Sequence, residues 1–187
     1  MSWIKEADLG DQGLPAIFQV ISLNPEALES VKRLNETLAF GGSGLTRVQE
    51  EAIATVVAAA NQCRYEALTH SGFLRRHSGD EELASHLLGD YTQVDLSPAD
   101  RHMLDFAVRL TQKPSSITKD DIEGLRGAGF NDEKILSIVL LTSLFNFMDR
   151  LADGLGVDLP VEYQKAAEQW LTGPATRQEW LIMPKEQ

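Results

Sequence analysis

The sequence has little cysteine: Cys63 is the single one among 187 residues. One cysteine excludes an internal disulfide framework. It also excludes a redox cycle in which two thiols of the same chain form and break a disulfide. It does not exclude a disulfide between Cys63 and another molecule.

Positive charge is also scarce, because 17 Lys and Arg face 28 Asp and Glu, for a net charge of −11. Phosphate repulsion then disfavours nonspecific nucleic-acid binding. The chain opens with Lys5, Glu6 and Asp8 instead of the apolar core of a signal peptide. Its longest apolar run, residues 135–148, is broken by polar side chains and predicted too short to span a membrane. We expect a cytoplasmic protein without a membrane or nucleic-acid partner.

No part of the sequence shows the pattern of a strand pair, so the predicted fold is all-α. Helices are expected to begin at Pro25, Thr46, Ser97, Thr118 and Asn131, where capping residues precede apolar positions at helical spacing. We divide the chain into an N-terminal arm (1–23), a helical domain (24–160) and a C-terminal helix with an arm (161–187). That arm should be extended after Gly173-Pro174 and pack on the domain or on a neighbouring subunit.

Residues 46–79 form the stretch that organises the chain. Thr46 and Gln49 form the pattern of a capping box, and the alanine-rich run 52–60 indicates a buried helix. Asn61 ends that run, and its side chain suits the N-cap of a second helix. We therefore predict two helices with a break near Asn61 and Gln62.

The predicted break decides which side chains meet. On one straight helix Glu51 and Cys63 would be separated by about 18 Å. If the helices instead run antiparallel, Glu51 stands beside His70 and Cys63 lies in the first turn of the second helix. Glu66 and His70 are four residues apart, so they should touch.

Residues 55–63 are weakly similar to residues 140–148, since each run is apolar and reaches an asparagine, Asn61 or Asn146. The long buried helix that Asn131 or Asp132 caps should end near Phe145, and residues 150–155 should form a last turn or a further short helix. This internal similarity suggests that the domain has two pseudo-equivalent halves.

Cys63 is either a reactive thiol or a small buried hydrophobe. A helix start and the neighbouring Arg64 would stabilise a thiolate, whereas Glu66 opposes it by like charge. His70 is either a base oriented by carboxylates or a structural core histidine. Glu51 could be an ordinary acid of a first helical turn, like Glu50. Glu51, Glu66 and His70 could also supply three ligands to a metal ion, but we expect no bound metal.

The pattern Glu51, Asn61-x-Cys63-x-Tyr65 and His70 resembles the carboxymuconolactone decarboxylase superfamily, in its alkylhydroperoxidase D-like, peroxidase-related branch. Further segments that resemble the family are 96–100, 127–130 and 145–152. The family pattern is a Glu, then Cys-x-x-Cys, then a His four residues on. Glu66 stands here at the place of the second cysteine. The resemblance implies a compact all-α fold of two pseudo-equivalent halves and a homo-oligomer.

Three functions follow from these residues and the resemblance. The first is an antioxidant peroxidase, in which Cys63 reduces a hydroperoxide and an external thiol regenerates it without a bound cofactor. The second is an acid–base enzyme of the decarboxylase or hydrolase type, in which Glu51, Glu66 and His70 move protons on a small organic acid or lactone. The third is a non-catalytic oligomer of the same fold. Asn61, Arg64 and Tyr65 are expected to support the site.

Overall fold

The computed structural model describes residues 2–7, 14–80 and 82–183, and every regular element in those ranges is a helix. The predicted all-α fold is therefore confirmed. The α-helices of the described residues are α1 (Ala16–Gln19), α2 (Pro25–Leu38), α3 (Arg47–Asn61), α4 (Arg64–Ser78), α5 (Leu83–Asp90), α6 (Pro98–Gln112), α7 (Lys119–Gly127), α8 (Asp132–Leu155), α9 (Val161–Trp170) and α10 (Glu179–Ile182). Three 3-10 turns join them: η1 (Tyr91–Gln93), η2 (Pro114–Ser116) and η3 (Gly173–Arg177).

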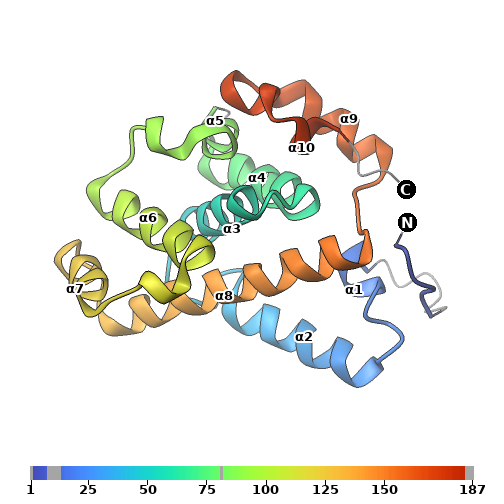
Figure 1. The fold of residues 1–187 in the computed structure, drawn as a ribbon, viewed down its shortest axis with the longest axis horizontal. Helices are drawn as coiled ribbons and strands as arrows, with labels where there is room; N and C mark the ends of the chain where they lie inside the picture. Colours follow the sequence, from blue (N-terminus) through green and yellow to red (C-terminus); the bar gives the residue numbers. More distant parts are fainter. Residues whose placement is uncertain (1, 8–13, 81, 184–187) are drawn as a thin grey trace.

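The hairpin of α3 and α4 lies at the centre of the molecule (Figure 1). The Thr46 side chain accepts from the Gln49 N–H, and the Gln49 side chain accepts from the Thr46 N–H, which confirms the predicted capping box. Gln62 then adopts a left-handed conformation (φ 56°) that ends α3 and turns the chain back. The predicted break is thus confirmed, although the N-cap of α4 is Cys63 and not Asn61.

The small side chains of α3 explain how four helices pack around it. Ala54, Val57 and Ala58 are fully buried, and α4, α5, α6 and α8 all contact this helix. Alanine is a strong helix former with little side-chain volume, so neighbouring backbones can approach closely. α3 consequently holds the side chains of its two ends, near Glu51 and Asn61, at fixed positions in the interior.

Helix α8 crosses the hairpin and continues through Asn146 to Leu155 without a break (Figure 1). The predicted end near Phe145 is therefore wrong. Of the two alternatives for residues 150–155, the last turn of a helix is confirmed and the separate short helix is wrong. The second break, which the likeness between the two runs suggested, is also wrong, because Met148 and Ala152 beyond that point belong to the main core and Asp149 accepts from Asn61 of α3. Within the described residues α8 alone is long and apolar enough to cross a membrane, because it extends beyond the apolar run 135–148 at both ends. It serves here as a core helix.

The two ends of the chain pack against the domain. Ile17 and Val20, in and after α1, belong to the main core, and the Trp3 N–H donates to the Leu155 carbonyl at 2.8 Å. At the other end, η3 and α10 pack on α5 and α4 and bury Leu181 completely. Residues 173–182 thus contain helical turns where an extended arm was predicted, and they lie on their own domain.

Candidate active site

The imidazole of His70 lies between two buried carboxylates. Its Nδ1 is 2.6 Å from Glu51 Oε2, and its Nε2 is 3.1 Å from Glu66 Oε2. All three residues are at most 6% exposed. Glu51 comes from α3, whereas Glu66 and His70 lie one turn apart on α4, so the hairpin brings the three together. Both contacts expected from the sequence are present.

These contacts determine the charge of His70. Burial alone would lower its pKa, but the hydrogen bonds to Glu51 and Glu66 outweigh burial and raise the pKa to about 10. The ring is therefore an imidazolium at neutral pH, and each nitrogen donates to one carboxylate. Phe145 and Phe73 meet the ring edge-on, with centroids 4.6 and 5.8 Å away. Apolar contacts and ion pairs together fix the orientation of the ring.

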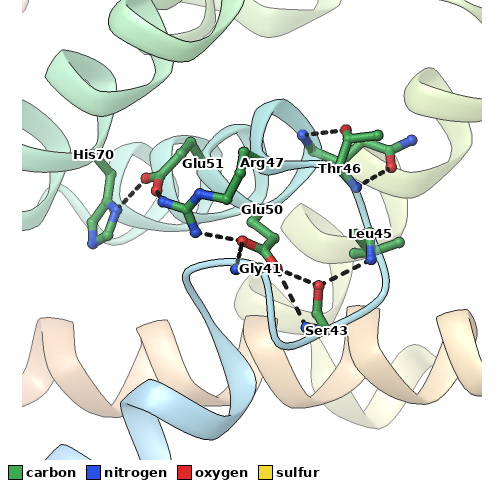
Figure 2. Close-up of polar contacts among 9 residues, drawn as sticks. Gly41, Ser43, Leu45, Thr46, Arg47, Glu50, Glu51 and His70 are labelled. Atoms are coloured by element: carbon green, nitrogen blue, oxygen red, sulfur yellow. Dashed lines mark hydrogen bonds and ion pairs between the residues drawn. The ribbon is translucent and has the colours of Figure 1, made fainter.

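Arg47 extends this chain of charges toward the surface (Figure 2). One guanidinium nitrogen pairs with Glu51 and the other with Glu50. Glu50 also accepts from the Gly41 N–H at 2.8 Å and from the Ser43 hydroxyl, so it anchors the loop between α2 and α3. The two neighbouring acids therefore differ: Glu51 contacts His70, while Glu50 holds the loop.

Cys63 is fully buried at the start of α4. Its thiol lies 3.7 Å from the Asp149 carbonyl oxygen, to which it can donate. Burial raises the pKa of the thiol far above its ordinary value, and the carboxyl groups of Asp149 and Asp153 raise it further. The hydrogen bond from the Glu66 N–H favours the thiolate, but it is outweighed. Cys63 is therefore a thiol in the resting protein.

Of the three residues expected to support the site, Arg64 and Tyr65 make their contacts away from it. Arg64 points away from Cys63, because its guanidinium donates to Asp158 at 2.6 Å and to the Leu181 carbonyl at 2.7 Å. The predicted stabilisation of a thiolate by Arg64 is therefore wrong. The Tyr65 hydroxyl accepts from the Ile17 N–H at 3.4 Å and ties α1 to α4.

Asn61 does contact the site, through a residue that sequence analysis did not single out. Its amide donates to Asp149 Oδ2 at 2.6 Å and to Asn146 Oδ1 at 3.1 Å. Asp149 is 1% exposed, and its other oxygen, Oδ1, has no hydrogen-bond partner. Burial raises the pKa of Asp149 to about 8, and the negative charge of Glu66 adds to the effect of burial.

Among the described residues, no three or more His, Cys, Asp or Glu side chains are arranged to hold a metal ion. A cavity of about 220 Å³ lies between α3, α5 and α6, lined by residues that include Gln62, Tyr91 and Trp180. No member of the Glu51–His70–Glu66 chain lines it.

Comparison with known proteins places this chain in a family. The model of the carboxymuconolactone decarboxylase family matches residues 25–109. The crystal structure of an uncharacterized peroxidase-related protein from Silicibacter sp. TM1040 is 33% identical in sequence, with a TM-score of 0.75, over 79% of this chain and 77% of that one. The chain belongs to the carboxymuconolactone decarboxylase and alkylhydroperoxidase D-like superfamily.

Two further structures extend the comparison within this superfamily and its fold. A peroxidase-related protein from Ralstonia eutropha JMP134, described as an alkylhydroperoxidase AhpD core, is 29% identical over 80% of this chain and 79% of that one (TM-score 0.75). The debrominase Bmp8 shares the fold at 16% identity and a TM-score of 0.73, over 83% of each chain. No curated protein matches the sequence.

Arg47 and Asp149 were not predicted from the sequence, although spacing could have indicated both. Arg47 lies three and four residues before Glu50 and Glu51, the separations at which helical ion pairs form. Thr142, Asn146 and Asp149 recur at helical spacing on an otherwise apolar helix. Such a polar stripe on a buried face indicates an interior polar site.

Proposed function

We propose that this protein is an acid–base enzyme that moves a proton on a small organic acid or lactone, with the Glu66 carboxylate as the base. The observation that carries the proposal is the environment of the two Glu66 oxygens. Oε2 is held by His70 at 3.1 Å, while the buried Oε1 has no hydrogen-bond partner. Because a buried acceptor without a partner is unfavourable, Oε1 is ready to accept a proton from a bound molecule.

His70, Glu51 and Arg47 position this base. The His70 imidazolium donates to Glu66, and Glu51 holds the other nitrogen of the ring. Arg47 and its loop then keep Glu51 in place. We assign His70 a positioning and electrostatic role, because both of its nitrogens are already engaged.

The test is proton exchange in D₂O, followed by ¹H NMR, with 2-oxobutanoate, levulinate and γ-butyrolactone as probes. Each probe carries C–H groups next to a carbonyl. Glu66→Gln keeps the shape of the side chain but removes the base, and we expect it to slow exchange by about 10²–10⁴-fold. Cys63→Ser is the matched control, which should retain the parental rate. Equal rates for the parent and Glu66→Gln would refute the proposal.

A second candidate is the thiol peroxidase, favoured by the 33% identity to a protein called peroxidase-related. In this scheme the Cys63 thiolate attacks a hydroperoxide and becomes a sulfenic acid, and an external thiol reduces it. The thiol would first have to lose its proton to a neighbouring base, because burial suppresses its ionisation. We rank this scheme second for that reason. A cytoplasmic homo-oligomer without a cofactor remains our proposal for either activity.

A further inference from the structure

We propose that Asp149 is the proton donor that works opposite Glu66, and that the substrate is a small carbonyl compound with an acidic C–H group next to the carbonyl. This inference rests on the proposed function and adds a catalytic residue and a reaction type to it. Asp149 lies outside the Glu51, Cys63 and His70 pattern.

The first argument is the fixed orientation of the Asp149 carboxyl group. Oδ2 accepts from the Asn61 amide at 2.6 Å, and Asn61 also donates to Asn146. Asn146 is held in turn by its own donation to the Thr111 hydroxyl at 2.8 Å. Oδ1 alone has no partner, although the residue is 1% exposed. The network thus uses one oxygen of Asp149 and leaves the other available.

The second argument is the charge around this carboxyl group. Glu66 and His70 face it from α4, Asp153 lies one turn on along α8, and the Cys63 thiol lies against its backbone. Burial and the two acids favour the protonated form, while His70 and the Asn61 hydrogen bond favour the ionised form. The balance raises the pKa to about 8, so Asp149 carries a proton at neutral pH.

Glu66 on α4 and Asp149 on α8 lie in the same buried region, where these two helices pack on each other. Each has one buried oxygen without a hydrogen-bond partner. A carboxyl group that holds a proton, near a second carboxyl group with an oxygen free to accept one, is the arrangement that acid–base catalysis requires.

The step balances without an oxidant or a reductant. Glu66 Oε1 takes the proton from the carbon next to the carbonyl, and the C–H electron pair becomes the C=C bond of an enol. The carbonyl π electrons move to oxygen, which takes the proton from Asp149 Oδ1. The proton on Glu66 then exchanges with D₂O, Glu66 returns a deuteron to the carbon, and the enol hydroxyl returns its proton to Asp149, which regenerates the carbonyl compound with deuterium on that carbon.

The experiment uses the same three probes with Asp149→Asn, and with Asp153→Asn as the control from the same helix. We expect Asp149→Asn to slow exchange at pH 7 by about 100-fold or more, and Asp153→Asn to leave most of the rate. Difference infrared spectra at pH 6 should show a protonated carboxyl band that Asp149→Asn removes, whether or not a probe is bound.

The outcomes separate the two proposals. Parental exchange in Asp149→Asn, or no carboxyl band assignable to Asp149, overturns the role of Asp149 and leaves Glu66 in place. Exchange that is indifferent to Glu66→Gln but lost in Asp149→Asn overturns the proposed function instead. If the wild-type protein exchanges none of the probes, both proposals fail.

Discussion

The His70→Leu variant is expected to lose about 3–5 kcal/mol of its free energy of unfolding, because it removes the cation between two buried carboxylates. Leucine preserves an apolar contact with Phe145, so loss of packing contributes little. Glu51 still has Arg47 as a partner, but Glu66 is left buried without an ion pair. Urea denaturation at pH 7 measures the loss.

Two comparisons make this result specific. His77→Leu changes an exposed residue of the same helix and should alter the free energy of unfolding by no more than about 0.5 kcal/mol. Adding Glu66→Gln to His70→Leu removes the unpaired charge and should restore more than about 1 kcal/mol. If the double variant is no more stable than His70→Leu, the ion pairs do not determine the loss.

The second prediction is that stability falls as pH rises, most steeply between about pH 4 and pH 8. The folded-state pKa of Asp149 is raised from 3.8 to about 8, so between these values the folded protein binds a proton that the unfolded chain has lost. Stability must then decrease with pH in that window, by several kcal/mol at about 1.4 kcal/mol per pKa unit. His70 adds a later loss, since its contribution is complete below about pH 6.5 and disappears as pH rises through about 10.

Asp149→Asn should reduce the loss of stability between about pH 4 and pH 8, because asparagine does not titrate. The free energy of unfolding, followed by urea denaturation from pH 4 to pH 10, should therefore fall less in this variant than in the parent. Asp120→Asn, at an exposed position on α7, should follow the parent curve. Parallel curves for the parent and Asp149→Asn would contradict the proposed protonation of the buried acid.

Much of the fold was predictable because local signals and tertiary packing agree. The capping box at Thr46, the proline at the start of α2 and the left-handed residue after Asn61 act within one turn of chain. The pairing of Glu51 with His70 followed once the hairpin was assumed. Long-range packing was less predictable: α8 does not end at Asn146, since Met148 and Ala152 beyond it are buried in the main core and Asp149 accepts from Asn61 of α3.

The chemistry of Cys63 was harder to predict, because its protonation depends on burial and on residues far along the chain. A helix start and an adjacent arginine suggested a thiolate. The structure directs Arg64 to Asp158 and places Asp149, 86 residues later, against the thiol. Only the packing of α8 on the hairpin shows that burial, followed by the nearby acids and not by the arginine, determines the protonation of Cys63.

We infer that Cys63 is a buried thiol that does not react, next to the proposed acid–base site. The mass of the intact protein after peroxide treatment tests this claim most directly. Folded protein is treated with hydrogen peroxide, quenched and weighed, with protein unfolded in urea as the control. We predict that Cys63 gains no oxygen in the folded protein, whereas the unfolded chain is oxidised. One oxygen on Cys63 of the folded protein, removed again by added thiol, would contradict the account and favour the peroxidase.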